Sequence, residues 1–282
     1  MVSRFGTVIA LSVLAVDPSE AFQCTSSYRT RRHNVQLAAE ANVRRAFLAT
    51  GGTAAVLALL GQSPPAAAAD EVMIDVYFGC GCFWHVQHEF VEAEHNILGR
   101  SDDELTARAG YAGGKTGAKD GKVCYHNIAN IADYGKLGHA EVVSLQIPPS
   151  KFQEFAVEYC KLFRNGMRPD QFGDRGSEYR NLVAFKGGSK SPLAQQLVEA
   201  SKATGDQLDF AVGKGTDEDI ARLVWIMDID QYPFFIAEQY HQFHDGFNLC
   251  ENYPSSYNSL AQKYAAKGEN FGSCPNGMMM WK

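Results

Sequence analysis

The stretch Val72-Met73-Ile74-Asp75-Val76-Tyr77-Phe78-Gly79-Cys80-Gly81-Cys82-Phe83-Trp84 decides the expected fold, because its pattern changes from strand to helix. Apolar residues recur at every second position from Val72 to Phe78, which is the period of a strand with one buried face. After the glycines, apolar residues recur at helical spacing from Phe83 to Ile97. We therefore expect Cys82 to lie where a strand ends and a helix begins.

Further strands and helices are expected downstream in mixed order. Strands are predicted over 141–147, 181–185, 208–212 and 224–229. A helix is predicted over 150–166, with Ser150 as a possible cap, and another from Ser191-Pro192 onward. The C-terminal tail is expected to be loose and helical. The order lacks regular βαβ alternation and so favours an α+β fold. Nothing repetitive or of low complexity divides residues 70–282, which suit a single domain.

The composition is that of a globular protein with a distinct N-terminal segment. The 282 residues are 45% hydrophobic, and their net charge of −6 argues against a broad nucleic-acid-binding surface. Residues 1–69 contain six arginines, no lysine and three acidic residues. Residues 70–282 contain 20 basic and 29 acidic residues, so the two segments differ in chemistry.

Residues 1–69 have the features of a targeting leader that is removed. A short apolar run over 8–16 is typical of a secretory signal, and the arginine-rich stretch over 26–45 is typical of a transit peptide. The twin arginines Arg44-Arg45, followed by an apolar core and the alanines 66–69, resemble a twin-arginine export signal.

This order of signals resembles the tripartite leaders of thylakoid-lumen proteins in algae with complex plastids. We therefore expect a mature chain of residues 70–282 in a plastid thylakoid lumen. The alternative is an uncleaved membrane anchor at residues 52–60, but nine residues are too few to cross a bilayer. The mature chain is thus expected not to span a membrane.

Cys82 is the candidate nucleophile. A cysteine at a helix N-terminus meets unpaired N–H groups and the positive end of the helix dipole, and both favour the thiolate. Gly79 and Gly81 would let a reactant approach the sulfur, and Phe83 and Trp84 offer an apolar surface beside it. A buried core cysteine next to two core aromatic residues explains the same pattern, so position alone leaves both interpretations open.

Glu141 is the candidate general acid. It begins a predicted strand on the same face as Val143, Leu145 and Ile147, where a carboxyl group should have a raised pKa. The alternative is a solvated carboxylate at a wet strand end. The polar cluster over 174–180 is, taken alone, typical of a surface loop.

Five segments, in order, resemble motifs of the A-type peptide-methionine sulfoxide reductases. They are Gly81-Cys82-Phe83-Trp84; Gly110-Tyr111-Ala112-Gly113-Gly114, which resembles a family turn; Gly138-His139-Ala140-Glu141; the block Gly166-Met167-Arg168, Gly173-Asp174 and Tyr179-Arg180; and Ala237-Glu238 with Tyr240-His241-Gln242. The resemblance covers residues 72–250 and implies a two-layer α+β sandwich, or plait, with a mixed sheet.

The resemblance implies thiol-dependent reduction of methionine-S-sulfoxide, free or in oxidised proteins. Cys82 would attack the sulfoxide sulfur and become a sulfenic acid. Phe83 and Trp84 would hold the S-methyl group, and Glu141 would protonate the departing oxygen. The other residues implied to bind that oxygen, directly or through water, are Tyr111, Tyr179 and Asp174.

A second thiol would then form a disulfide with Cys82, and a thioredoxin-like donor would reduce it without any cofactor or metal. Cys274 is the favoured resolving residue, because Gly272-Ser273-Cys274-Pro275 resembles a common family ending. Cys250 is the second choice or a relay partner; both cysteines lie in the tail of about 245–282. Cys124 is a candidate exposed thiol and Cys160 a candidate structural residue. We expect a monomer.

The chain departs from the family pattern at several positions. His85 replaces a glycine, Arg175 a histidine, Ser177-Glu178 a Thr-Gln pair and His244 a tyrosine, and residues 125–137 form an insertion. These departures bear on substrate preference and rate more than on the type of reaction.

Two other functions stay open. A thiol–disulfide oxidoreductase or peroxidase using Cys80 and Cys82 would need Cys80 but not Glu141. A weakened, non-catalytic module that binds oxidised methionine is suggested by His85 and Arg175. Cys80 can also be simply a small residue at a strand end, and no histidine stands at zinc-ligand spacing from both cysteines.

Overall fold

The computed structural model describes residues 71–171, 173–205, 208–245 and 253–274. The predicted leader and Cys250 lie outside the described residues. Within the described part, one sheet has seven strands in the order β5-β6-β4-β1-β3-β2-β7. The strands are β1 (Ile74–Gly79), β2 (Arg108–Ala112), β3 (Ala140–Ile147), β4 (Leu182–Phe185), β5 (Asp209–Val212), β6 (Leu223–Asp228) and β7 (Phe235–Ile236).

The sheet is mixed, as the α+β prediction requires. β1 is central and runs antiparallel to both β3 and β4, while β2 is antiparallel to β3 and β7. β6 is parallel to β4 and β5. The β1–β3 register places Phe78 opposite Val143, which brings the end of β1, and hence Cys82, next to the start of β3.

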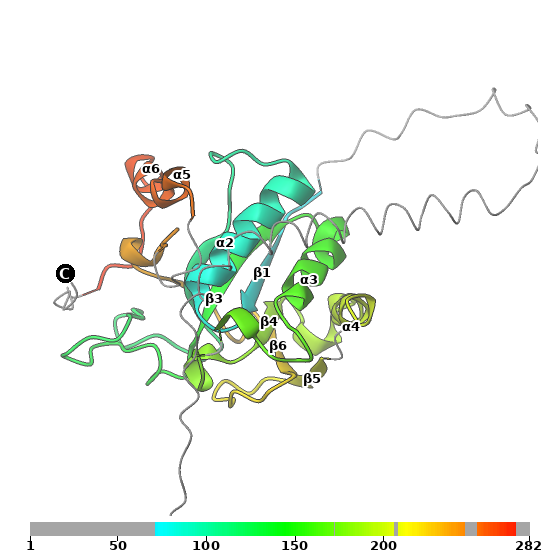
Figure 1. Ribbon diagram of the computed structural model, residues 1–282. Helices are drawn as coiled ribbons and strands as arrows, with labels where there is room; N and C mark the ends of the chain where they lie inside the picture. The colour runs from blue at the N-terminus through cyan, green and yellow to red at the C-terminus, as the bar shows by residue number, and fades with distance from the viewer. Residues whose placement is uncertain (1–70, 172, 206–207, 246–252, 275–282) are drawn as a thin grey trace, which may run out of the picture. The chain divides into compact units, whose positions relative to one another are not determined.

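Three helices cover one face of the sheet: α2 (Phe83–Ala93), α3 (Phe152–Lys161) and α4 (Leu193–Ala203). Figure 1 shows them together on one side of the strands. The main core lies between these two layers, where side chains such as Phe78, Phe90 and Phe155 are fully buried. Such burial supplies most of the stability of a two-layer domain.

The opposite face of the sheet carries a smaller core. It contains Tyr77, Val142, Leu182, Met227 and Tyr232, which alternate with the residues that face the helices. This alternation confirms the strand period seen in the sequence, since adjacent residues of β1 point to opposite cores.

Two local expectations are wrong. Gly110 was expected in a turn but lies in β2, where a side chain would overlap the Phe234 ring; glycine here marks a close approach to a strand. Ser150 was expected to cap a helix, but the chain first makes a 3₁₀ turn, η3 (Pro149–Lys151), so that Lys151 precedes α3 without a side-chain cap. Ser191 does accept the Leu193 amide at the start of α4.

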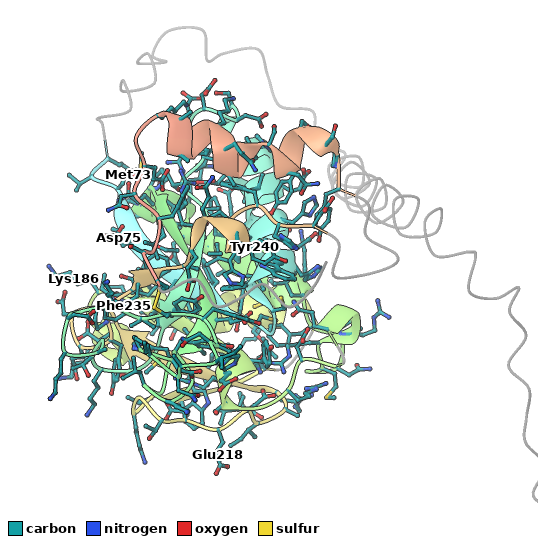
Figure 2. All side chains as sticks on the ribbon, turned by 90° about the vertical axis from the view of Figure 1, so that its left-hand side faces the viewer. Met73, Asp75, Lys186, Glu218, Phe235 and Tyr240 are labelled. Atoms are coloured by element: carbon teal, nitrogen blue, oxygen red, sulfur yellow. A yellow bond between two sulfur atoms is a disulfide. The ribbon has the colours of Figure 1, made fainter. Side chains whose placement is uncertain are left out.

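The C-terminal part is helical, with α5 (Ser255–Asn258) and α6 (Leu260–Ala266). Arg108 of β2 pairs with Glu269 at 2.6 Å and stacks its guanidinium 3.9 Å from the centre of the Tyr264 ring, which fixes the segment to the domain. Figure 2 shows α5 and α6 at one end of the domain, above Tyr240. Among the described helices, none has the length and apolar character needed to cross a membrane.

Candidate active site

Cys82 lies at the junction between β1 and α2, as predicted. It is the residue before the first turn of α2, in an extended conformation, and only 6% of it is exposed. Gly81 has a positive φ of 76° and donates its amide to the Tyr179 carbonyl. A side chain at Gly81 would also overlap Gln171, whose side-chain oxygen Oε1 accepts the Cys82 amide. The turn that presents the thiol therefore requires glycine.

Glu141 lies close to Cys82, the predicted nucleophile. It is 1% exposed, and its Oε2 accepts the Phe83 amide at 3.0 Å. Its Oε1 accepts the hydroxyl of Tyr134 at 3.1 Å, and the carboxyl group lies close enough to the Cys82 thiol for each to shift the pKa of the other. Burial raises the pKa of Glu141 to about 8, partly opposed by these hydrogen bonds. The predicted raised pKa of a carboxyl group on an apolar strand face is confirmed.

The expectation of a resting thiolate at Cys82 is wrong. Burial, and then the Glu141 carboxylate, raise the pKa of the thiol well above its ordinary value. The helix N-terminus does not offset this, because Glu141 already takes the Phe83 amide and Gln171 takes the Cys82 amide. The Trp84 amide alone acts to lower the thiol pKa. Cys82 therefore rests as a thiol beside Glu141.

Phe83 and Trp84 belong to a larger aromatic cluster. Phe83 is almost fully buried, and its ring lies 5.3 Å from that of His241. Trp84 is half-buried, and its ring lies 4.0 Å from that of His244. Tyr125 closes the cluster, with its ring 4.3 Å from His241. The accessible apolar surface next to Cys82 is thus provided by Trp84 more than by Phe83.

The Tyr111 hydroxyl is bound to another carboxyl group, that of Glu238. Tyr111 faces Glu141 in the β2–β3 register, but its hydroxyl donates to Glu238 Oε2 at 2.8 Å. Glu238 Oε1 accepts the amide of Tyr125 at 2.9 Å. Tyr111 therefore holds Glu238, and through it the start of the inserted segment, 125–137.

Tyr134, which was not among the predicted site residues, donates its hydroxyl to Glu141. Sequence reasoning missed it because it lies in the insertion, which no family motif covers. The available signal was local: Tyr134 stands seven residues before Glu141. Its ring stacks on Tyr111 with centroids 4.7 Å apart, which directs the hydroxyl toward the carboxyl group.

Asp174 and Tyr179 both lie near Cys82 and Glu141. Burial raises the pKa of Asp174, opposed by Arg168, and the Asp174 charge in turn raises the pKa of Cys82 and of Glu141. Arg168 donates to the Asp174 carbonyl at 2.6 Å and pairs with Asp219 at 2.9 Å. Tyr179, in the 3₁₀ turn η5 (Ser177–Tyr179), has a raised pKa from burial and from Glu141. The polar cluster is therefore part of the site.

The cysteines are arranged differently from expectation. Cys124 is buried and forms a disulfide with Cys274, so it is not an exposed thiol. The Cα atoms of the pair are 5.7 Å apart. Cys80 and Cys160 are buried and form no disulfide, and burial raises the pKa of Cys80 to about 12. No disulfide joins Cys80 to Cys82, which favours the interpretation of Cys80 as a small residue at a strand end.

Comparison with known proteins agrees with this geometry. The family described as peptide methionine sulfoxide reductase matches residues 74–270. The chain is similar to MsrA 2 of Mesorhizobium japonicum, with 31% identity over 65% of this chain and 80% of that protein. It is also similar to MsrA of Trichodesmium erythraeum, with 28% identity over 60% and 81%. A solved methionine sulfoxide reductase A of Corynebacterium diphtheriae overlaps 61% of this chain and 73% of that one, at 20% identity and a TM-score of 0.38.

The buried thiol–carboxyl pair at a strand–helix junction of an α+β domain defines an oxidoreductase of the thiol-dependent class. The chain belongs to the peptide methionine sulfoxide reductase family. The predicted family, fold class and enzyme class are thereby confirmed.

Proposed function

We propose that the chain reduces methionine-S-sulfoxide, free or in oxidised proteins, through a sulfenic acid on Cys82. The observation that carries this proposal is the position of Glu141, a buried acid with a pKa of about 8. It accepts the amide of Phe83, the residue after Cys82, and its charge raises the pKa of the Cys82 thiol. A nucleophile and a proton donor close together are what an oxygen transfer from sulfur to sulfur requires.

The proton balance follows from this arrangement. Cys82 sulfur attacks the sulfoxide sulfur, and the S–O oxygen leaves only if it is protonated. Glu141 is largely protonated at neutral pH and gives its proton to that oxygen, while it takes up the thiol proton of Cys82. A second proton from Glu141 lets the oxygen leave as water, with a bond left between the Cys82 sulfur and the substrate sulfur. Water then bonds to the Cys82 sulfur, the sulfur–sulfur bond breaks with its electron pair on the thioether, and Glu141 takes back a proton. The products are the thioether and Cys82 sulfenic acid, with Glu141 protonated as it began.

The remaining side chains of the site divide into two groups. One group would stabilise the departing oxygen and the proton on Glu141: Tyr134, Tyr179 and Asp174. Tyr134 donates a hydrogen bond to the Glu141 carboxyl group, and Tyr179 and Asp174 interact with it electrostatically. Tyr111 acts indirectly, as a positioning residue that holds Glu238. Trp84, supported by Phe83, would take the S-methyl group.

The sulfenic acid is proposed to be resolved by Cys274, with Cys250 as the second choice, and the electrons to come from a thioredoxin-like dithiol. Support comes from the free Cys82 and the oxidised Cys124–Cys274 pair, a combination expected once a disulfide has passed from Cys82 to the tail. Cys274 can resolve Cys82 only after this pair has been reduced.

Turnover of separate sulfoxide epimers by the full chain, with dithiothreitol as reductant, tests the proposal. We expect reduction of the S epimer alone and its loss in Cys82→Ser. Turnover of only the R epimer, or of neither, would contradict it. The alternative function, a thiol–disulfide oxidoreductase or peroxidase that uses Cys80 and Cys82, predicts instead that Cys80→Ser inactivates the enzyme and that Glu141→Gln does not. A binding module predicts tight sulfoxide binding without turnover.

We also propose, from the sequence of the leader, that residues 1–69 direct the chain to a plastid thylakoid lumen and are removed. Separately, we propose that the mature protein is a monomer. A fluorescent fusion of residues 1–69 that stays in the cytosol of an alga with complex plastids would refute the targeting proposal. Light scattering of the purified protein measures the oligomeric state.

A further inference from the structure

Arg168 belongs to the motif Gly166-Met167-Arg168, which the proposed reaction does not use. Its side chain is only 2% exposed and forms an ion pair with Asp219, whose side chain is 7% exposed. The pair has two branches: Nη1 lies 3.2 Å from Asp219 Oδ1, and Nη2 lies 2.9 Å from Asp219 Oδ2. Because both ends of the guanidinium meet the same carboxylate, its plane and direction are fixed.

The guanidinium also binds the backbone of residues in the active site. Its Nη2 donates to the Asp174 carbonyl at 2.6 Å, and its Nη1 donates to the Tyr179 carbonyl. The Tyr179 carbonyl also accepts the amide of Gly81 at 3.1 Å, in the turn that presents Cys82. A single buried side chain, that of Arg168, therefore connects Asp174, Tyr179 and the turn before the nucleophile.

Asp219 makes a further contact with the same part of the chain. Its Oδ2 accepts the amide of Gly176 at 3.2 Å, and the Gly176 carbonyl accepts the Tyr179 amide at 2.9 Å. Gly176 is the residue from which η5 begins. Asp219 therefore holds both the guanidinium and the backbone at the start of η5.

Asp219 lies in the segment 213–222 between β5 and β6, which none of the family-like motifs includes. Asp217 is buried, and its carboxylate accepts two backbone amides of the same segment. Trp225 of β6 donates its indole N–H to the Glu218 carbonyl at 2.9 Å. These contacts on either side of the chain fix the backbone that carries Asp219.

We propose that the Arg168–Asp219 pair is a positioning device for the reaction at Cys82. It acts through the backbone of Asp174, of Tyr179 and of the turn before the nucleophile. This proposal rests on the proposed function, in which Tyr179 and Asp174 stabilise the departing oxygen and the proton on Glu141. A displacement of about 1 Å in such groups can slow a chemical step by about a hundredfold.

Steady-state kinetics of the full chain with methionine-S-sulfoxide and dithiothreitol test the proposal. Asp219→Asn keeps the size of the side chain but removes its charge, and we expect kcat to fall by at least about tenfold. KM should change by less than about twofold, because the S-methyl group is bound by Trp84, outside the hydrogen bonds of this pair. Asp219→Glu restores the carboxylate and should recover most of the lost kcat.

Two control variants remove a carboxylate without altering the pair. Glu218→Gln changes the neighbouring residue, whose side chain is exposed and lies at the outer edge of the domain in Figure 2. Glu269→Gln breaks a different ion pair, that with Arg108, and so measures the effect of losing such a pair elsewhere. Both variants should keep kcat, with folding verified by circular dichroism.

Arg168→Lys provides a second test if Asp219→Asn does not fold. Lysine keeps a positive charge beside Asp219, but its single ammonium group cannot replace the planar fork that also binds two carbonyl groups. We expect kcat to fall in this variant as well. Unchanged kcat in Asp219→Asn or in Arg168→Lys, a loss that Asp219→Glu does not recover, or an equal loss in Glu218→Gln would overturn the proposal.

Hydrogen exchange separates this proposal from the proposed function. The Gly81 amide exchanges only after its bond to the Tyr179 carbonyl opens, so peptides over 79–84 should exchange faster in Asp219→Asn. Peptides from α3 should change less, which distinguishes a local effect from general destabilisation. Unchanged exchange over 79–84 would overturn the positioning role even in an active chain. Absence of turnover in the unaltered chain would instead contradict the proposed function, and exchange would then decide the positioning role alone.

Discussion

The Tyr134 hydroxyl donates a hydrogen bond of 3.1 Å to the Glu141 carboxyl group, although Tyr111 faces Glu141 directly across the β2–β3 pair. The tyrosine that reaches the acid thus comes from the inserted segment 125–137, and the tyrosine of the family-like motif supports Glu238 instead. Because the two hydroxyl groups bind different carboxyl groups, their contributions to activity can be separated by experiment.

Removal of the Tyr134 hydroxyl should lower the rate of the chemical step. Tyr134→Phe keeps the ring stacking but takes away a donor at Glu141, and we expect kcat with dithiothreitol to fall about tenfold to a hundredfold. Tyr111→Phe is the control: it removes a hydroxyl of equal size that binds Glu238, and kcat should fall less. Equal losses in both variants would contradict a direct role for Tyr134.

The activity should depend on pH through Glu141. Its pKa of about 8 keeps it protonated below that pH, and it loses the proton as the pH rises through 8. Since the protonated form is the acid, kcat should be sustained on the acidic side and fall on the alkaline side of about pH 8. Rate profiles of the full chain and of Glu141→Gln test this. The variant should be slower by about 10²-fold or more and lack the alkaline fall. A fall near pH 8 that persists in the variant would exclude Glu141 as its origin.

Gly81 should be far less tolerant of a side chain than Gly99. Both have positive φ, 76° and 67°, but a side chain at Gly81 would overlap Gln171, while nothing lies within 4 Å of the corresponding position at Gly99. Gly99→Ala measures the conformational strain alone, about 1 kcal/mol. Gly81→Ala should lower the free energy of unfolding further and displace the Cys82 amide from Gln171. Chemical denaturation of both variants compares them, and equal losses would show that the Gln171 contact is unimportant.

The Cys124–Cys274 bond should be revealed by non-additive effects on stability. Loss of either cysteine removes the same cross-link, and we expect each single Ser variant to be less stable by about 2–4 kcal/mol. The double variant should be no less stable than the singles. Denaturation under non-reducing conditions measures this, with Cys160→Ser as a variant that breaks no disulfide. Fully additive losses from Cys124→Ser and Cys274→Ser would mean that the two residues are not joined in solution.

The same variants bear on electron delivery. If Cys274 resolves Cys82, Cys274→Ser should keep turnover with dithiothreitol, a small dithiol that can reduce Cys82 directly, and lose most turnover with a thioredoxin. Unchanged turnover with thioredoxin would move the resolving role to another residue.

Much of the fold followed from periodicity. The alternation before Gly79 and the helical spacing after Cys82 are local properties of the chain, because side-chain burial on one sheet face or one helix face repeats every 2 or 3.6 residues. The sequence did not predict β2, because glycines are typical of turns. Gly110 is required instead by the close approach of the Phe234 ring, a contact between distant segments that a single sequence does not reveal.

The sequence by itself determined that Cys82 lies at a strand–helix junction and that Glu141 lies on the apolar face of a strand. Both depend on patterns within a few residues of Cys82 and Glu141. The tertiary structure alone decided which groups surround them. Tyr134 binds Glu141, Tyr111 binds Glu238, and Cys124 is bonded to Cys274. Burial and the Glu141 charge keep Cys82 a thiol. The physical reason is that hydrogen bonds, disulfides and desolvation depend on distances between segments far apart in the chain, which no local period encodes.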